Sequence, residues 1–81
     1  QNYPNPFNPA TKINFSVKET AKVELIVYNM QGQEVARLID GIVTAGNHKV
    51  KFNASNLPSG VYCYRLRSNE FTSVKKMLLI K

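Results

Sequence analysis

The chain is poor in the side chains that catalytic and metal sites require. Its 81 residues include no tryptophan, one cysteine, one histidine and one aspartate. The single Cys63 excludes an internal disulfide framework and a zinc site built from several cysteines. A Ser/His/Asp triad could draw only on His48 and Asp40, and no serine stands in the turn sequence that such a nucleophile occupies.

Carboxylates are also scarce, since aspartate and glutamate together number five. A glycosidase needs two facing carboxylates, whereas Glu24 and Glu34 better fit outward positions of strands. A calcium site needs several clustered oxygen ligands, and Asp40 stands alone. We therefore predict that the chain is not an enzyme and that it has no catalytic, metal-binding or cofactor-binding residues.

Long apolar runs and glycine-rich loops are missing as well. The apolar run at residues 77–80 is far shorter than the ~20 residues that cross a bilayer, so we expect no transmembrane segment. The four glycines are scattered among turns and form no phosphate-binding loop. Because the chain is short and opens on Gln1, we expect residues 1–81 to be a single domain excised from a larger protein.

Positive charge is what the chain has in excess, with a net +6 from eleven basic and five acidic side chains. A basic surface attracts anions, but dispersed lysines on strand faces and edges also keep sheets from associating. We assign the single charges to solvated strand faces. The cluster of Lys75, Lys76 and Lys81 at the C-terminus remains a candidate binding surface.

Alternating apolar and polar residues predict β-strands from residue 13 onwards. Ile13, Phe15 and Val17 form one half-buried strand, and residues 23–28 are apolar on both faces, which is typical of a central strand. Gly32 is expected to take a positive φ in the hairpin loop that follows.

The middle of the chain is harder to interpret. Residues 34–39 fit neither a strand nor a helix period, so a β-bulge and a short helical turn both stay open. Asp40 and Gly41 begin an expected long connection that ends at residues 45–47. His48 and the apolar residues that follow it occupy alternate positions of the strand, so their side chains are expected on the same face. This favours a partly buried structural histidine over a metal ligand.

The last third reads as a turn cluster followed by two hairpin strands. Leu57 is expected to plug one end of the core from the turn at residues 53–60. Residues 61–67 form a strand in which Cys63 acts as a small buried hydrophobe. Residues 71–80 supply one long strand or two short ones. Six to seven short strands with no amphipathic helix predict an all-β fold, an antiparallel β-sandwich, with a small closed barrel as the competitor.

Aromatic residues offer one ligand site. A platform for sugars or single-stranded nucleic acid could combine four rings with two arginines: Tyr28, Tyr62, Tyr64, Phe71, Arg65 and Arg67. Tyr62 and Tyr64 share a strand face with Leu66, however, and such a face usually packs in the core. We expect no nucleic-acid partner and a monomeric domain.

The leader at residues 2–9 carries three prolines and two aromatic rings. Proline fixes φ near −65° and lacks an N–H group, and the residue before it is pushed towards extended geometry. Neither a helix nor a central strand can form there. We expect residues 1–11 to form a stiff leader whose Tyr3 and Phe7 pack on the sandwich.

Five segments in this order resemble the C-terminal sorting domain of the type IX (Por) secretion system of Bacteroidetes-like bacteria. They are residues 2–11 (NYPNPFNPAT), 27–35 (VYNMQGQEV), 45–48 (AGNH), 59–62 (SGVY) and 75–81 (KKMLLIK). Each motif alone is weak, but the five in register are specific, and together they cover essentially the whole chain.

The resemblance implies an immunoglobulin-like sandwich that serves as a folded, non-catalytic export signal at the end of a secreted protein. A cargo domain would be fused covalently on its N-terminal side. The type IX translocon of a Gram-negative bacterium would read the signal after export to the periplasm. A sortase-like peptidase would then remove it and attach the cargo to the cell surface, or the cargo would be released.

Motif matching also carries recognition onto particular residues: Pro4, Asn5, Pro6, Gly60, Tyr62, Lys75, Lys76 and Lys81. Cys63 and Asn69 depart from the family pattern, which more often has an aromatic or aliphatic residue and a turn glycine at these positions. The lysines flank the edge of the last strand, so we expect a receptor to pair with that strand by strand addition.

Two other functions stay open. The immunoglobulin-like domain of the flagellar hook-capping protein shares the proline-rich opening and the hairpin pattern, and it would make the chain a structural subunit. An accessory carbohydrate-binding module of a polysaccharide-degrading enzyme would instead require at least two exposed, coplanar rings.

Overall fold

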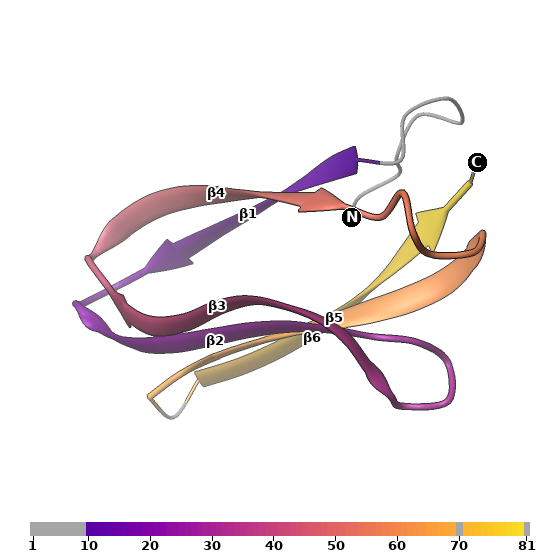
Figure 1. Ribbon diagram of the computed structural model, residues 1–81. Coiled ribbons are helices and arrows are strands. Elements are labelled where there is room, and N and C mark those ends of the chain that lie inside the picture. Colours follow the sequence, from indigo (N-terminus) through magenta and orange to yellow (C-terminus); the bar gives the residue numbers. More distant parts are fainter. Residues whose placement is uncertain (1–9, 70, 81) are drawn as a thin grey trace.

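The computed structural model describes residues 10–69 and 71–80, and every helix or strand in these two stretches is a β-strand (Figure 1). The strands are β1 (Ala10–Val17), β2 (Ala21–Tyr28), β3 (Glu34–Val43), β4 (Gly46–Asn53), β5 (Gly60–Ser68) and β6 (Phe71–Leu79). The first strand thus begins within the expected leader. The packing predicted for Tyr3 and Phe7 lies outside the described residues.

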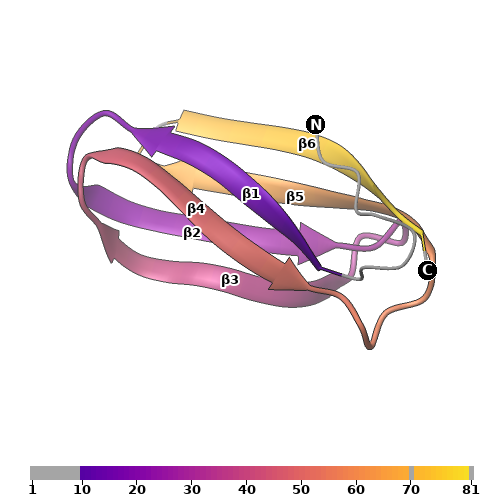
Figure 2. The ribbon, with the colours of Figure 1, turned by 90° about the horizontal axis from the view of Figure 1, so that it is seen from above.

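The strands form two antiparallel sheets that pack face to face. β1 pairs with β4 in a small sheet, and the larger sheet has the order β3, β2, β5, β6. Figure 1 shows the two layers from the side, and in Figure 2 the small sheet slants across the large one. The predicted antiparallel β-sandwich is confirmed with six strands, and β2 is the central strand that its two apolar faces indicated.

Side chains from the inner faces of both sheets fill the core. Period-two alternation in β1 buries Ile13 and Val17 and leaves Phe15 packed against them. Tyr62 and Tyr64 are only 4% and 6% exposed, so their assignment to the core is correct. The remaining core side chains are Val23, Leu25, Val27, Phe52, Ala54, Leu66, Met77 and Leu79. Leu57 packs against this cluster from its turn, as predicted.

β3 follows neither period because it is irregular against β2. The register between the two strands shifts after Leu25 and again after Val27. Each shift sets an extra residue of β3 against β2 and breaks the alternation of faces. Val35, Leu38 and Ile39 therefore all pack against the core. The β-bulge is the correct alternative for this segment, and the helical turn is wrong.

The long connection predicted after residue 39 is also wrong, because β3 runs on to Val43 and only Thr44 and Ala45 separate it from β4. Asp40 and Gly41 look like turn residues in the sequence. In the structure they pair with β2, and the Asp40 carboxylate lies 3.4 Å from Arg37 on the same strand. Asp40 and Gly41 are therefore strand residues, and the turn lies further along the chain.

The tight turns follow the predicted chemistry. Gly32 has φ 82°, and the Asn29 side-chain oxygen accepts the N–H groups of Gln31 and Gln33 at 3.0 and 2.9 Å. Asn69 follows β5 in a turn and has φ 53°, in the left-handed region that asparagine tolerates better than most other non-glycine residues. Asparagine can therefore stand where the family more often has glycine.

Candidate recognition surface

The predicted recognition residues fall into two groups. Outside the described residues lie Pro4, Asn5, Pro6 and Lys81. The others lie on two neighbouring strands: Gly60, Tyr62, Lys75 and Lys76. β6 runs antiparallel beside β5, with Gly60 opposite Leu79 and Tyr62 opposite Met77. Two motifs that are separate in the sequence thus meet on one hairpin.

Tyr62 is a structural residue of this hairpin. Its side chain is buried, and its hydroxyl donates a 2.7 Å hydrogen bond to the carbonyl oxygen of Pro58, four residues upstream. The same arrangement, a tyrosine bonded back to the preceding backbone, marks the tyrosine corner of immunoglobulin-like sandwiches. Tyr62 therefore fixes the turn that leads into β5 and presents little surface of its own.

Lys75 and Lys76 are exposed but point to opposite faces of the sheet. Lys75 lies opposite Tyr64 on the inner face, and Lys76 lies opposite Cys63 on the outer face. β6 is an edge strand, because among the described residues it pairs with β5 alone. Lys75 and Lys76 hence do not form one patch. One of them belongs to the seam between the two sheets.

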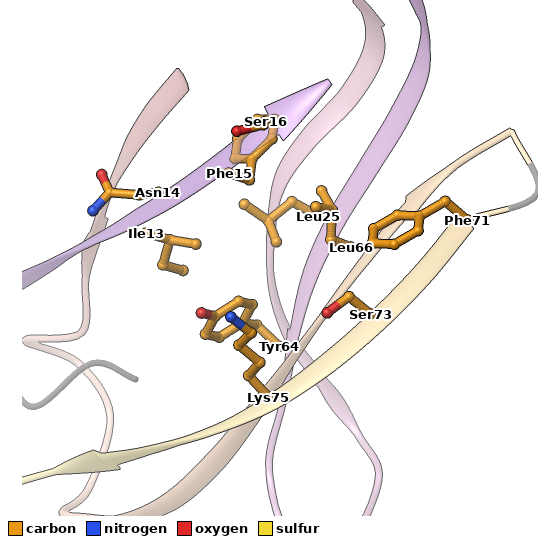
Figure 3. A pocket seen from close by; sticks show the side chains of 10 residues that line it. All are labelled: Ile13, Asn14, Phe15, Ser16, Leu25, Tyr64, Leu66, Phe71, Ser73 and Lys75. Atoms are coloured by element: carbon orange, nitrogen blue, oxygen red, sulfur yellow. The ribbon is translucent and has the colours of Figure 1, made fainter. Parts of the chain in front are cut away.

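A groove opens along that seam, between β1 and β6. It has a volume of about 240 Å³ and is lined by Ile13, Asn14, Phe15, Ser16, Leu25, Tyr64, Leu66, Phe71, Ser73 and Lys75 (Figure 3). Leu25 and Leu66 form part of an apolar floor, and Phe71 and Lys75 rise from β6. The sequence does signal this opening, since Ser73 and Lys75 occupy inward positions of a strand whose later inward residues are buried.

The outer face of the larger sheet carries a network of compensated charges. Arg37 binds the Glu34 carboxylate through two nitrogens, at 2.9 and 3.2 Å, and lies 3.8 Å from Glu24. The hydrogen bonds to Glu34 raise the pKa of Arg37 above its ordinary value, although partial desolvation opposes them. Glu24 also lies 3.9 Å from Arg67. These carboxylates form ion pairs on the outer face of the sheet, which agrees with the outward strand positions predicted for them.

The outer face of the small sheet is positive. Lys12 lies directly opposite Lys51, and Lys49 lies opposite Asn14. All these side chains are exposed, and no salt bridge to the three lysines is found among residues 10–69 and 71–80. Charge is therefore unevenly distributed, with acids concentrated on the larger sheet.

The remaining candidates for chemistry are structural. His48 stacks on Phe15, with ring centroids 5.3 Å apart, and its Nε2 lies 2.7 Å from the carbonyl oxygen of Thr44. That contact fits a donated N–H, and the histidine is partly buried as predicted. Within the described stretches no three His, Cys, Asp or Glu side chains gather as metal ligands. Cys63 is half-buried on the outer face, so its assignment as a buried hydrophobe is only partly right.

The four rings do not assemble into a platform. Tyr62 and Tyr64 face the core, Tyr28 lies beneath the guanidinium of Arg65 at 5.3 Å, and Phe71 lines the groove. A stacking surface would need two of these rings exposed side by side. The structure favours packing over sugar binding for this set of residues.

No helix in the described residues is long and apolar enough to span a membrane.

Comparison with known proteins identifies one family. No curated protein sequence matches the chain. The family model of the secretion system C-terminal sorting domain, however, matches residues 1–81. Such domains are sorting signals, and the family is not known as catalytic. With this match and an all-β sandwich, the chain belongs to the C-terminal sorting domains of type IX secretion.

Proposed function

We propose that this domain directs a cargo polypeptide, fused to its N-terminal side, across the outer membrane through the type IX translocon. The family match over residues 1–81 carries the proposal. A sortase-like peptidase removes the domain after translocation and attaches the cargo to the cell surface, or the cargo is released. The domain acts as a monomer and contributes no chemistry of its own.

We place recognition on the β5–β6 hairpin. Lys75 and Lys76 are exposed charges on an edge strand, where a receptor can reach both the side chains and the backbone. Gly60 and Tyr62 act indirectly, because the hydrogen bond from Tyr62 to Pro58 fixes the turn that precedes β5. Pro4, Asn5, Pro6 and Lys81 complete the proposed recognition set from outside the described residues.

A folded sandwich suits this role for a physical reason. An export signal that waits in the periplasm must resist proteolysis and non-specific association. The described edge strands carry lysines at exposed positions, such as Lys12 on β1, Lys49 on β4 and Lys76 on β6, which disfavour sheet-to-sheet association. The domain can therefore remain compact while its last strand stays accessible.

Charge reversal on the hairpin tests this placement. The 81-residue chain is fused to a periplasmic reporter enzyme in a bacterium with a complete type IX system, and reporter activity is measured outside the cells. We expect the double variant Lys75→Glu/Lys76→Glu to lose most of its exported activity, because each substitution turns attraction for an acidic receptor into repulsion.

The matched control is Lys49→Glu/Lys51→Glu, which makes the same change of charge on the outer face of β4. It should export as the unmodified fusion does. Equal loss in both variants would show that net charge matters and the position of the lysines does not. Unchanged export of the hairpin variant would remove recognition from β6.

A further inference from the structure

The groove between β1 and β6 has the features of a binding site for an extended peptide. The small sheet covers the larger one only in part, so burial changes along the inner face of β6. Met77 and Leu79 are both 3% exposed, whereas Phe71 is 58% exposed. The exposed ring and the apolar floor together form an apolar surface that a partner could cover.

The two strands present different sides to the groove. From β1 the lining residues are consecutive, Ile13 to Ser16, which is how the edge of a strand is lined. From β6 they alternate, at Phe71, Ser73 and Lys75, which is how the face of a strand is lined. In the described residues β1 pairs with β4 alone. An added segment would therefore pair with the edge of β1 and pack on the inner face of β6.

The space fits a short extended segment. A second hollow of about 370 Å³ continues the groove past Phe71, and Ser16 and Phe71 line both. The distance along β6 from Phe71 to Lys75 is four strand steps, or about 13 Å. β1 and β6 run in opposite directions (Figure 2), so a segment antiparallel to β1 runs parallel to β6.

The charge of the groove selects the occupant. Among the described residues, Lys75 is the one charged residue that lines the 240 Å³ groove (Figure 3), whereas Lys18 and Glu19 line the second hollow past Phe71. An extended segment has alternate side chains on one face. The inward side chains of the added segment would thus contact three places in order. These are the ring of Phe71, the part of the groove formed by Leu66 and Ser73, and the ammonium group of Lys75.

We propose that this groove receives an extended segment of a protein of the secretion machinery, which adds as a third strand beside β1. The segment carries apolar residues at two alternate positions and an acidic residue at the next alternate position, in the spacing of Phe71, Ser73 and Lys75. This inference rests on the proposed function and specifies its receptor contact. It moves the added strand from the outer edge of β6 to the edge of β1.

A designed peptide tests the proposal on the isolated 81-residue chain labelled with ¹⁵N. The probe is a capped pentapeptide, leucine-threonine-leucine-threonine-glutamate, which places both leucines and the glutamate on one face. We expect saturable shifts of the amide signals of β1 residues 13–17 and β6 residues 71–75. A second probe with its last two residues exchanged places the glutamate on the opposite face and should bind at least about fivefold more weakly.

Variants of the chain test the contacts. Lys75→Glu and Phe71→Ala should each weaken binding at least about fivefold, while the charge-matched Lys49→Glu should change it less than twofold. Absence of binding, equal binding of both probes, or shifts centred elsewhere would overturn the proposal. So would a loss in Lys49→Glu as large as that in Lys75→Glu.

Two other occupants would also overturn it. If the groove signals depend on protein concentration without peptide, a second copy of the chain fills the groove. If removal of residues 1–9 alone exposes the site to the probe, the chain's own leader fills it. The assay involves no export, so failed peptide binding with normal export refutes only the groove. Normal peptide binding with export that ignores the hairpin lysines would refute both the placement of recognition on the hairpin and the receptor role of the groove, while the sorting function itself would stand.

Discussion

At the scale of single residues, the tyrosines of this protein have different structural roles. Their spacing in the sequence alone does not distinguish these roles. Tyr62 is buried and uses its hydroxyl to bind Pro58. Tyr28 is half-buried on the outer face, where its ring lies under the guanidinium of Arg65. The first is needed for the turn before β5, whereas the second contributes surface packing.

Replacing Tyr62 with phenylalanine should lower the free energy of unfolding by about 1 kcal/mol, because one partly buried hydrogen bond is lost while the ring stays in place. Urea unfolding followed by circular dichroism measures the change. Tyr28→Phe is the control, since it removes a hydroxyl but keeps the stacked ring, and it should stay within about 0.5 kcal/mol of the parent. Equal losses in the two variants would contradict a specific role for the Pro58 bond.

At the scale of strands and turns, the β2–β3 hairpin shows how turn chemistry and register act together. The loop is closed by two bonds to the Asn29 side-chain oxygen and by Gly32 at φ 82°. Beyond the loop, β3 is irregular against β2 and reaches Val43 without breaking. A residue other than glycine at position 32 must adopt a left-handed conformation, which costs ~1–2 kcal/mol.

Gly32→Ala is therefore expected to destabilise the domain by about 1 kcal/mol, after allowance for the smaller entropy of the unfolded alanine chain. Gly41→Ala is the matched control within the same hairpin. Gly41 has no positive φ, and an added methyl group would meet no atom within 4 Å. It should cause no loss and could raise stability by up to about 1 kcal/mol. Urea midpoints that fall equally for both variants would contradict this account of the loop.

The strands show what the sequence can predict and why it fails elsewhere. β1 and β5 alternate strictly, so Ile13, Val17 and Tyr64 were assignable to the core from their spacing. β3 was not, because its register shifts move side chains between faces without any change in composition. Asp40 was misread as a turn residue, because its pairing with Glu24 of β2 depends on the register of the hairpin, which the residue type does not reveal.

The candidate site was predictable only in part. The sequence motifs located Lys75 and Lys76 on the terminal strand, and parity alone assigns them to opposite faces. The inward parity of Ser73 and Lys75 signals that the first half of β6 is not covered, but the shape and lining of the groove were not predictable, because they depend on how far the small sheet extends over the larger one. Phe71 was considered as part of a ring platform, and it instead stands alone at the seam between the sheets.

At the scale of the whole molecule, the fold combines a closed core with an accessible C-terminal strand. The packed core is apolar, and acids of the larger sheet form ion pairs with arginines such as Arg37. Among the described residues β6 pairs with β5 alone and carries the exposed lysines Lys75 and Lys76, so a receptor can reach this strand. This division is consistent with the proposed role as a sorting signal that the secretion machinery recognises.

The most direct test of this account is the dependence of export on the type IX machine. The 81-residue chain is fused to the C-terminus of a reporter enzyme that already reaches the periplasm, and the reporter is assayed in periplasm, cell surface and medium. The account predicts reporter on the surface or in the medium of a strain with the translocon, and periplasmic retention in an otherwise identical strain without it. The same distribution in both strains would contradict it.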